Sequence, residues 1–226
     1  MATDTRSWWR RPWVVPLTVL VVAFLVYALP PYLTLDPAQS RSRLNAAFPP
    51  HYPMLELHIA FGTVAIVTVC LQLWPWLRQR HPAVHRTSGR LYVFAGMGPS
   101  AVLALAITPV TSLTLIGKAG AVAWAGLGLV TTITGFLMAR RRRYADHRRW
   151  MLYSFAFAMT PITGRALFYP VLLVPGLEFE DLVLIGQIGA FWLGWIINVA
   201  LVALWLRRTP RRQPRRPSRA PRQAAA

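Results

Sequence analysis

Apolar residues gather into long runs along the chain, and short polar segments separate one run from the next. Each run has roughly 20 residues, enough for a helix to cross about 30 Å of hydrocarbon at about 1.5 Å per residue. Six runs are present, at residues 13–33, 54–77, 88–108, 113–139, 150–173 and 182–206. The pattern predicts an all-α polytopic membrane bundle of about six transmembrane helices over residues 13–206.

Basic residues precede the first run, as they do in the n-region of a signal peptide: Arg6, Arg10 and Arg11. The run is longer than a typical h-region, and no clear small-residue cleavage site follows it. We therefore expect an uncleaved anchor helix that ends at Pro30-Pro31, after a cytoplasmic segment at residues 1–12.

The composition agrees with a membrane environment. The chain has 55% hydrophobic and 14% charged residues, whereas a soluble domain usually carries about 25% charged residues. The net charge of +18 would also suit nucleic acid, but the arginines lie between and after the apolar runs, as in cytoplasmic loops. We expect no nucleic-acid partner. The basic loops and a disordered tail at 207–226 are expected to contact anionic lipid headgroups.

The positions of the basic residues predict the orientation. With the N-terminus inside, 21 of the 25 arginines and lysines fall on cytoplasmic segments. Arg41, Arg43 and Lys118 fall outside, and Arg165 lies within a run. The excess of basic residues therefore places both termini in the cytoplasm. Lys118 is the only lysine, a bias associated with GC-rich bacterial genomes, so we expect a bacterial inner membrane.

The chain also contains an internal repeat. A shift of 62 residues, without a gap, places the segment from His85 over that from His147, Met97 over Met159 and Pro99 over Pro161. Both hairpins would run in the same direction, as parallel repeats about an axis along the membrane normal. The repeat predicts a four-helix core at 54–173, flanked by the first and last helices.

The repeat places His85 and His147 at equivalent points, where they would face each other across the axis. Two facing imidazoles at one depth suit the axial ligands of a b-type haem. The adjacent Arg86 and Arg148 could neutralise its propionates.

A second interpretation assigns the two His-Arg pairs to lipid phosphates or helix capping. Thr87 or Ser88 would then N-cap the third helix and Asp146 the fifth. His85 would lie just outside its helix, which suits a buried haem poorly.

The opposite end offers a second candidate site at Glu56, His58, Arg165 and Tyr169. A charged side chain within a span is a candidate functional group because its burial is costly unless it is paired or hydrated. Arg165 would either extend to the interface or bind an anionic or quinone-like ligand or a haem propionate. Because Gly120 stands where the repeat would need a partner for His58, we expect no second bis-histidine haem.

Other residues are predicted to have structural roles. His51 and His81 lie beside prolines and are expected to be solvated, and Cys70 is expected to be a buried hydrophobe. The glycines of the fourth run either permit close helix approach or leave room for a flat cofactor: Gly120, Gly126, Gly128 and Gly135. No P-loop, HExxH, GxSxG or GxGxxG pattern is present, so soluble-type hydrolysis and nucleotide-driven transport find no support.

Several segments, in chain order, carry a family resemblance: Leu57-His58-Ile59, His85-Arg86-Thr87-Ser88-Gly89-Arg90-Leu91-Tyr92, His147-Arg148-Arg149-Trp150-Met151, and Arg165. They resemble the bacterial membrane protein family called domain of unknown function 2306, over roughly residues 54–170. The resemblance implies a polytopic membrane protein and no established reaction.

A second resemblance is architectural, to the ascorbate-reducible transmembrane di-haem cytochromes b. In that family the third and fifth helices bind one haem, and the second and fourth bind the other. The resemblance implies roles for His85, His147 and His58, whereas Gly120 departs from it.

These observations predict a cytochrome b-like electron-transfer protein with an inner haem b. The alternative is a non-redox small-solute transporter or an accessory subunit, in which Pro99 and Pro161 would be hinge kinks.

Overall fold

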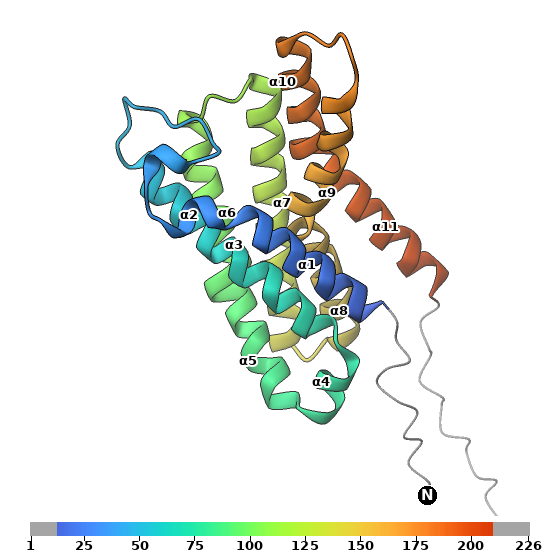
Figure 1. The fold of residues 1–226 in the computed structure, drawn as a ribbon. Helices are drawn as coiled ribbons and strands as arrows, with labels where there is room; N and C mark the ends of the chain where they lie inside the picture. The colour runs from blue at the N-terminus through green and yellow to red at the C-terminus, as the bar shows by residue number, and fades with distance from the viewer. Residues whose placement is uncertain (1–12, 210–226) are drawn as a thin grey trace, which may run out of the picture.

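The computed structural model describes residues 13–209, and within that range the secondary structure is entirely helical (Figure 1). The elements are α1 (Val14–Ala28), α2 (Pro30–Leu33), η2 (Pro37–Gln39), α3 (His51–Leu73), α4 (Pro75–Arg80), α5 (Pro82–Tyr92), η3 (Val93–Met97), α6 (Gly98–Ile107), η4 (Thr108–Val110), α7 (Leu115–Arg140), α8 (Tyr144–Ala158), α9 (Thr160–Phe168), η5 (Tyr169–Leu173), α10 (Phe179–Ile188), η6 (Gly189–Leu193) and α11 (Gly194–Arg208). The predicted segment 1–12 and most of the predicted tail lie outside the described residues. Arg207 and Arg208, assigned to that tail, instead complete α11.

The predicted all-α membrane bundle is confirmed, with four to five spans among the described helices. Four are long and apolar enough to cross a membrane: His51–Leu73, Pro82–Val110, Leu115–Arg140 and Phe179–Arg208. A fifth is the bent pair Tyr144–Ala158 and Thr160–Leu173. The count of six is not confirmed, because α1 has 15 residues and reaches only about 22 Å.

The helices break where the two mid-span prolines stand. Pro99 lies in the first turn of α6, directly after the π-helical η3, in which Gly96 has φ −129° and ψ −106°. Pro161 lies in the first turn of α9, which is bent by 40° from α8. Proline lacks the N–H that a helix interior needs, so each helix is interrupted just before it.

The predicted N-caps of the third and fifth runs are wrong. The helix α5 begins at Pro82 and α8 at Tyr144, so Ser88 and Asp146 lie inside helices. Proline at the first helical position already has the helical φ and needs no N–H partner there, which moves the start of α5 upstream. As a result, His85 lies within a helix.

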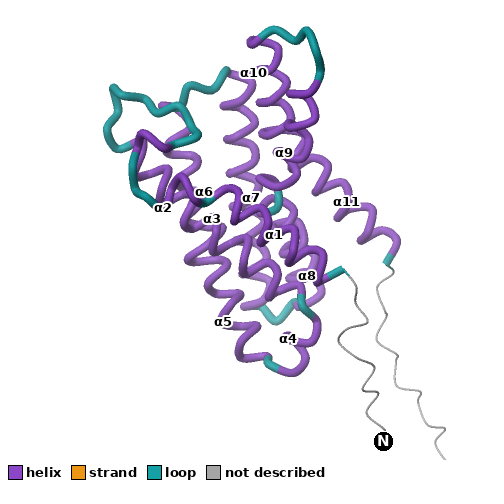
Figure 2. The backbone as a smooth tube through the Cα atoms, in the orientation of Figure 1, coloured by secondary structure: helices purple, strands orange, loops and turns teal. Residues whose placement is uncertain are grey.

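The ends of the bundle differ in composition. The α4–α5 and α7–α8 junctions lie at one end, together with the start of α1 and the end of α11 (Figure 1). We call this the connector end; its junctions carry Arg78, Arg80 and the run 140–143. The opposite loop end carries the long loop before α3 and the α9–α10 loop (Figure 2).

The core between α3, α5, α7 and α8 is packed around a buried polar chain. The Tyr92 hydroxyl lies 2.6 Å from the Ser154 hydroxyl, which lies 2.6 Å from that of Thr132. Thr132 in turn donates to the Gly128 carbonyl at 2.7 Å. All three hydroxyls are therefore satisfied inside an apolar region, where an unpaired polar group would be costly.

Three of the four α7 glycines named from the sequence permit close packing. A Cβ would meet Trp192 at Gly120, Met97 at Gly128 and the Met151 sulfur at Gly135. At Gly126 nothing lies within 4 Å. Neighbouring side chains, rather than an open slot, occupy these three positions.

Candidate functional site

The structure places both inner histidines at the connector end. His85 lies in the second turn of α5 and His147 in the first turn of α8. His147 lies within electrostatic range of His85. The facing arrangement that the repeat predicts for these two residues stays a prediction.

The hydrogen bonds of the pair leave nitrogen atoms available. The His147 Nδ1–H donates to the Gly135 carbonyl at 2.8 Å, which fixes the tautomer and leaves Nε2 with a free lone pair. The Nδ1 atom of His85 is buried and has no hydrogen-bond partner among the described residues. A buried imidazole nitrogen without a partner calls for an explanation, and a bound ion or group is one.

Other side chains hold the α5 backbone in place and supply positive charge near His85. Gln72 on α3 donates to the His85 carbonyl at 2.8 Å and to the Ser88 hydroxyl at 2.6 Å. Arg78 and Arg86 both act electrostatically on His85. Arg148 instead packs over the Trp205 ring of α11, 4.9 Å from its centroid.

The connector end offers two histidine side chains as donors. No cluster of three or more His, Cys, Asp or Glu residues occurs between residues 13 and 209, so a three-ligand metal site has no support there. Deeper in the bundle, Tyr92, Met151 and Phe155 belong to the closed core. A flat group bound to the imidazoles would therefore be confined to the connector end.

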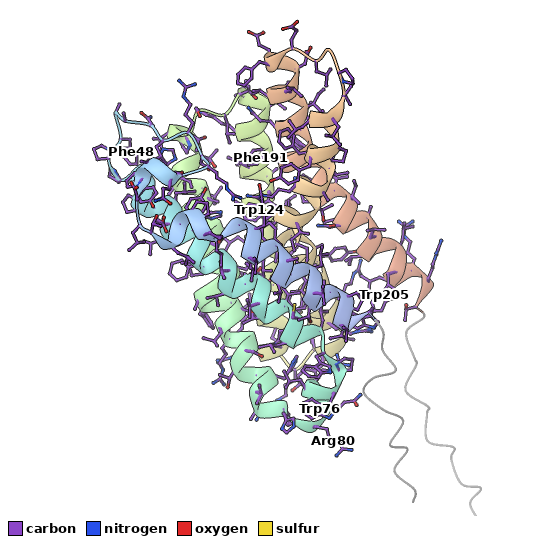
Figure 3. All side chains as sticks on the ribbon, in the orientation of Figure 1. Phe48, Trp76, Arg80, Trp124, Phe191 and Trp205 are labelled. Atoms are coloured by element: carbon purple, nitrogen blue, oxygen red, sulfur yellow. The ribbon has the colours of Figure 1, made fainter. Side chains whose placement is uncertain are left out.

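His58 lies apart from this pair, next to a small cavity. Its Nδ1–H donates to the Ser100 carbonyl at 2.9 Å, and the Ser100 hydroxyl donates back to the His58 carbonyl at 3.2 Å. The ring stands edge-on to Trp124, which lies at mid-height of the bundle (Figure 3). The cavity has about 40 Å³ and is lined by His58, Gly62, Met97, Ser100, Trp124 and Pro161, among others. It is large enough for a water molecule.

The remaining outer residues fall into two separate places. Arg165 donates to the Pro161 carbonyl at 3.1 Å and lies over Phe24 of α1. Glu56 lies one turn after Tyr52 on α3, and both the Glu56 Oε1 atom and the Tyr52 hydroxyl are buried without a hydrogen-bond partner among the described residues. The described contacts thus do not join the predicted group of Glu56, His58 and Arg165.

Tyr169 has a partner that the sequence did not reveal. Its hydroxyl hydrogen-bonds that of Tyr27 at the end of α1, with the rings edge to face. Arg41, from the long loop, lies 4.2 Å above the Tyr27 ring. No motif spacing links these residues, because three segments distant in sequence supply them.

The prediction for His51 is wrong. This residue is 2% exposed, and its Nδ1 accepts the Asn45 N–H at 3.0 Å. This hydrogen bond holds the loop at Asn45 against the start of α3. A neighbouring proline therefore did not indicate that the histidine is exposed to solvent. His81 is exposed and its ring packs on Trp76, at the connector end.

Apolar spans, interrupted helices and a packed helical core define the class as an integral membrane protein. The family model described as predicted membrane protein, DUF2306, matches residues 55–206, and the chain belongs to this family. The match extends past the predicted end at residue 170 into the last span. No curated protein and no solved structure matches the chain in these comparisons.

Proposed function

We propose that this membrane protein is a cytochrome b-like electron carrier, with His85 and His147 as axial ligands of one haem b at the connector end. The observation that supports it is the His85 Nδ1 atom, which is buried without a hydrogen-bond partner at the end of the bundle that also carries His147. The His147 bond to a backbone carbonyl orients the ring as outer-shell partners orient ligating histidines elsewhere.

Each nearby residue has a defined role in this proposal. Gln72 and Ser88 hold the α5 backbone that carries His85 against α3. Arg86 and Arg78 supply positive charge beside His85, suited to pairing with propionate carboxylates. A bis-histidine haem supplies one-electron exchange without an open coordination position for a substrate.

An absorption spectrum tests the proposal directly. The full chain would be expressed with haem precursor and purified in mild detergent. We expect Soret and α bands that shift on reduction by dithionite, with one haem per chain. His85→Ala and His147→Ala are each expected to abolish the bands, because one remaining imidazole cannot complete the axial pair.

The matched control is His81→Ala, on the same connector but exposed; it should keep the full spectrum. Far-UV circular dichroism would report folding for every variant, and glutamine would replace alanine where helicity is lost. A colourless, fully helical wild-type protein would contradict the proposal. That outcome would favour the non-redox alternative, a transporter or an accessory subunit.

We also propose that the connector end faces the cytoplasm of a bacterial cell. The support is that its junctions carry the arginine runs, which lie inside in most membrane proteins. Arg141→Cys and Ser112→Cys place exposed thiols at the connector and loop ends. An impermeant maleimide should label Ser112→Cys in intact cells and Arg141→Cys only after permeabilisation; the reverse pattern would refute this orientation.

A further inference from the structure

A cluster of aromatic rings and guanidinium groups lies toward the loop end, far from the histidine pair. It consists of Phe24, Tyr27, Arg41, Arg165 and Tyr169, which we call the Tyr27–Tyr169 cluster. The two tyrosine hydroxyls bond to each other across α1 and η5. Arg41 lies over the Tyr27 ring at 4.2 Å, and Arg165 over the Phe24 ring at 5.2 Å.

The aromatic rings hold the cations in place without neutralising them. Cation–π contact orients a guanidinium and leaves its charge and N–H groups available. No ion pair between a carboxylate and Arg41 or Arg165 is observed within residues 13–209, where an ion pair joins Arg143 and Asp146. Two positive charges therefore act on the tyrosine pair without an ion-paired carboxylate in that range.

The hydrogen-bond donors of the cluster are also largely unused. A guanidinium has about five N–H donors, and one of those of Arg165 donates to the Pro161 carbonyl at 3.1 Å. No described residue accepts a hydrogen bond from Arg41. The two tyrosines share one bond, which leaves one hydroxyl proton free to donate outward. At the edge of a bilayer, such a set of donors needs acceptors.

We infer that the Tyr27–Tyr169 cluster binds a phosphate group, with Arg41 and Arg165 as the charged donors. Phosphate suits the planar fork of arginine, which can give two parallel charge-assisted bonds to its oxygens. A phosphate monoester carries about two negative charges and would offset both cations. The phosphodiester of a phospholipid carries one, and in both groups several oxygens can accept from the arginines and the tyrosine hydroxyl. The same chemistry would come from a phospholipid headgroup or from a soluble phosphate ester.

The site ties three segments together. Tyr27 ends α1, Arg41 belongs to the loop before α3, and Tyr169 and Arg165 belong to η5 and α9. Occupation would therefore hold the short helix α1 against the fifth span, in addition to their apolar contact at Val21 and Ile162. This inference is independent of the haem proposal, because no residue is shared.

Native mass spectrometry of the full chain in detergent would test the inference. The probes are a synthetic phosphatidylglycerol and a glycolipid that has the same acyl chains and no phosphate. We expect the phospholipid to be retained in preference to the glycolipid. Arg41→Gln and Arg165→Gln should each weaken that retention by about tenfold, since each removes charge-assisted bonds.

Arg43→Gln is the matched control, because Arg43 is an exposed arginine two positions along the same loop, with no contact to the tyrosines. Calorimetric titration with glycerol 3-phosphate distinguishes the two sources of the phosphate group. If glycerol 3-phosphate binds, the site takes a soluble phosphate ester. If it does not bind and the phospholipid is retained, the site takes a lipid headgroup. Equal effects of Arg41→Gln and Arg43→Gln, or equal retention of both lipids without glycerol phosphate binding, would overturn the inference. Because Arg41 lies in a loop, its variant remains informative even if Arg165→Gln fails to fold.

Discussion

Gly164→Ala is expected to destabilise the protein strongly, although it adds a single methyl group. A Cβ at this position would lie 2.9 Å from the Ala190 Cα and 3.1 Å from its carbonyl oxygen. Both are backbone atoms of η6, so relief requires the helices to separate and not just a side chain to rotate. Gly194 faces the same crossing, where its own Cβ would lie 3.2 Å from the Gly164 backbone.

Overpacking of this kind costs about 1–3 kcal/mol, and rigid neighbours place Gly164→Ala at the upper end of that range. The measurement is the free energy of unfolding in mixed micelles titrated with a denaturing detergent. Gly189→Ala is the control, since its nearest neighbour would be the Leu167 Cβ at 3.9 Å. It should be neutral or stabilise by up to about 1 kcal/mol through helix propensity. Equal behaviour of the two variants would show that α9 and η6 do not cross this closely.

Gly120→Ala is the second substitution with a large expected effect. Its Cβ would lie 2.7 Å from the Trp192 indole nitrogen and 2.8 Å from the Phe191 carbonyl oxygen. Trp192 could move only by giving up its hydrogen bond to the Ile116 carbonyl, which is 3.0 Å long. Figure 3 shows Phe191 close to the height of Trp124 in the bundle, where α7 meets the last span.

We expect Gly120→Ala to cost about 2–3 kcal/mol, combining overpacking with a lost hydrogen bond. The control is Gly126→Ala on the same helix, where a Cβ meets nothing within 4 Å. Helix propensity alone should make that variant more stable by up to about 1 kcal/mol. Thermal unfolding of both variants, followed by circular dichroism in one detergent, gives the comparison. A stable Gly120→Ala protein would mean that the last span does not pack against α7 here.

Run length and charge placement predicted the class of fold because both follow directly from the cost of polar groups in hydrocarbon. Helix boundaries were less predictable. The helix in the run at 13–33 was expected to end at Pro30-Pro31, and α1 ends slightly earlier, at Ala28, with Pro30 beginning the separate α2. Proline has no N–H with which to continue the helical hydrogen bonds, so apolar length overstated helical length. The predicted N-cap of the third run was wrong for a related reason, because the helix begins at Pro82 and not after Ser88.

Some residues of the candidate sites could likewise be predicted from the sequence, and others could not. His85 and His147 could be predicted as a pair because each is followed by an arginine and their spacing matches that of Pro99 and Pro161. Tyr27 and Arg41 carried no such signal, because an aromatic residue near a helix end is typical of any membrane interface. Only the packing of α1 and the loop onto η5 shows that they meet Tyr169. Contacts of this kind depend on tertiary arrangement, which spacing along one chain does not encode.

The hydrogen bond between Tyr92 and Ser154 joins positions 62 apart, the same interval at which Gly62 and Trp124 line one cavity. In the first pair a bulky side chain from one hairpin hydrogen-bonds a small one from the other, and in the second a bulky and a small residue line the same cavity. Two copies of the first hairpin would set tyrosine against tyrosine, and two copies of the second would set tryptophan against tryptophan. The two hairpins thus present different side chains to each other, and a molecule held in that cavity would meet a different wall on each side.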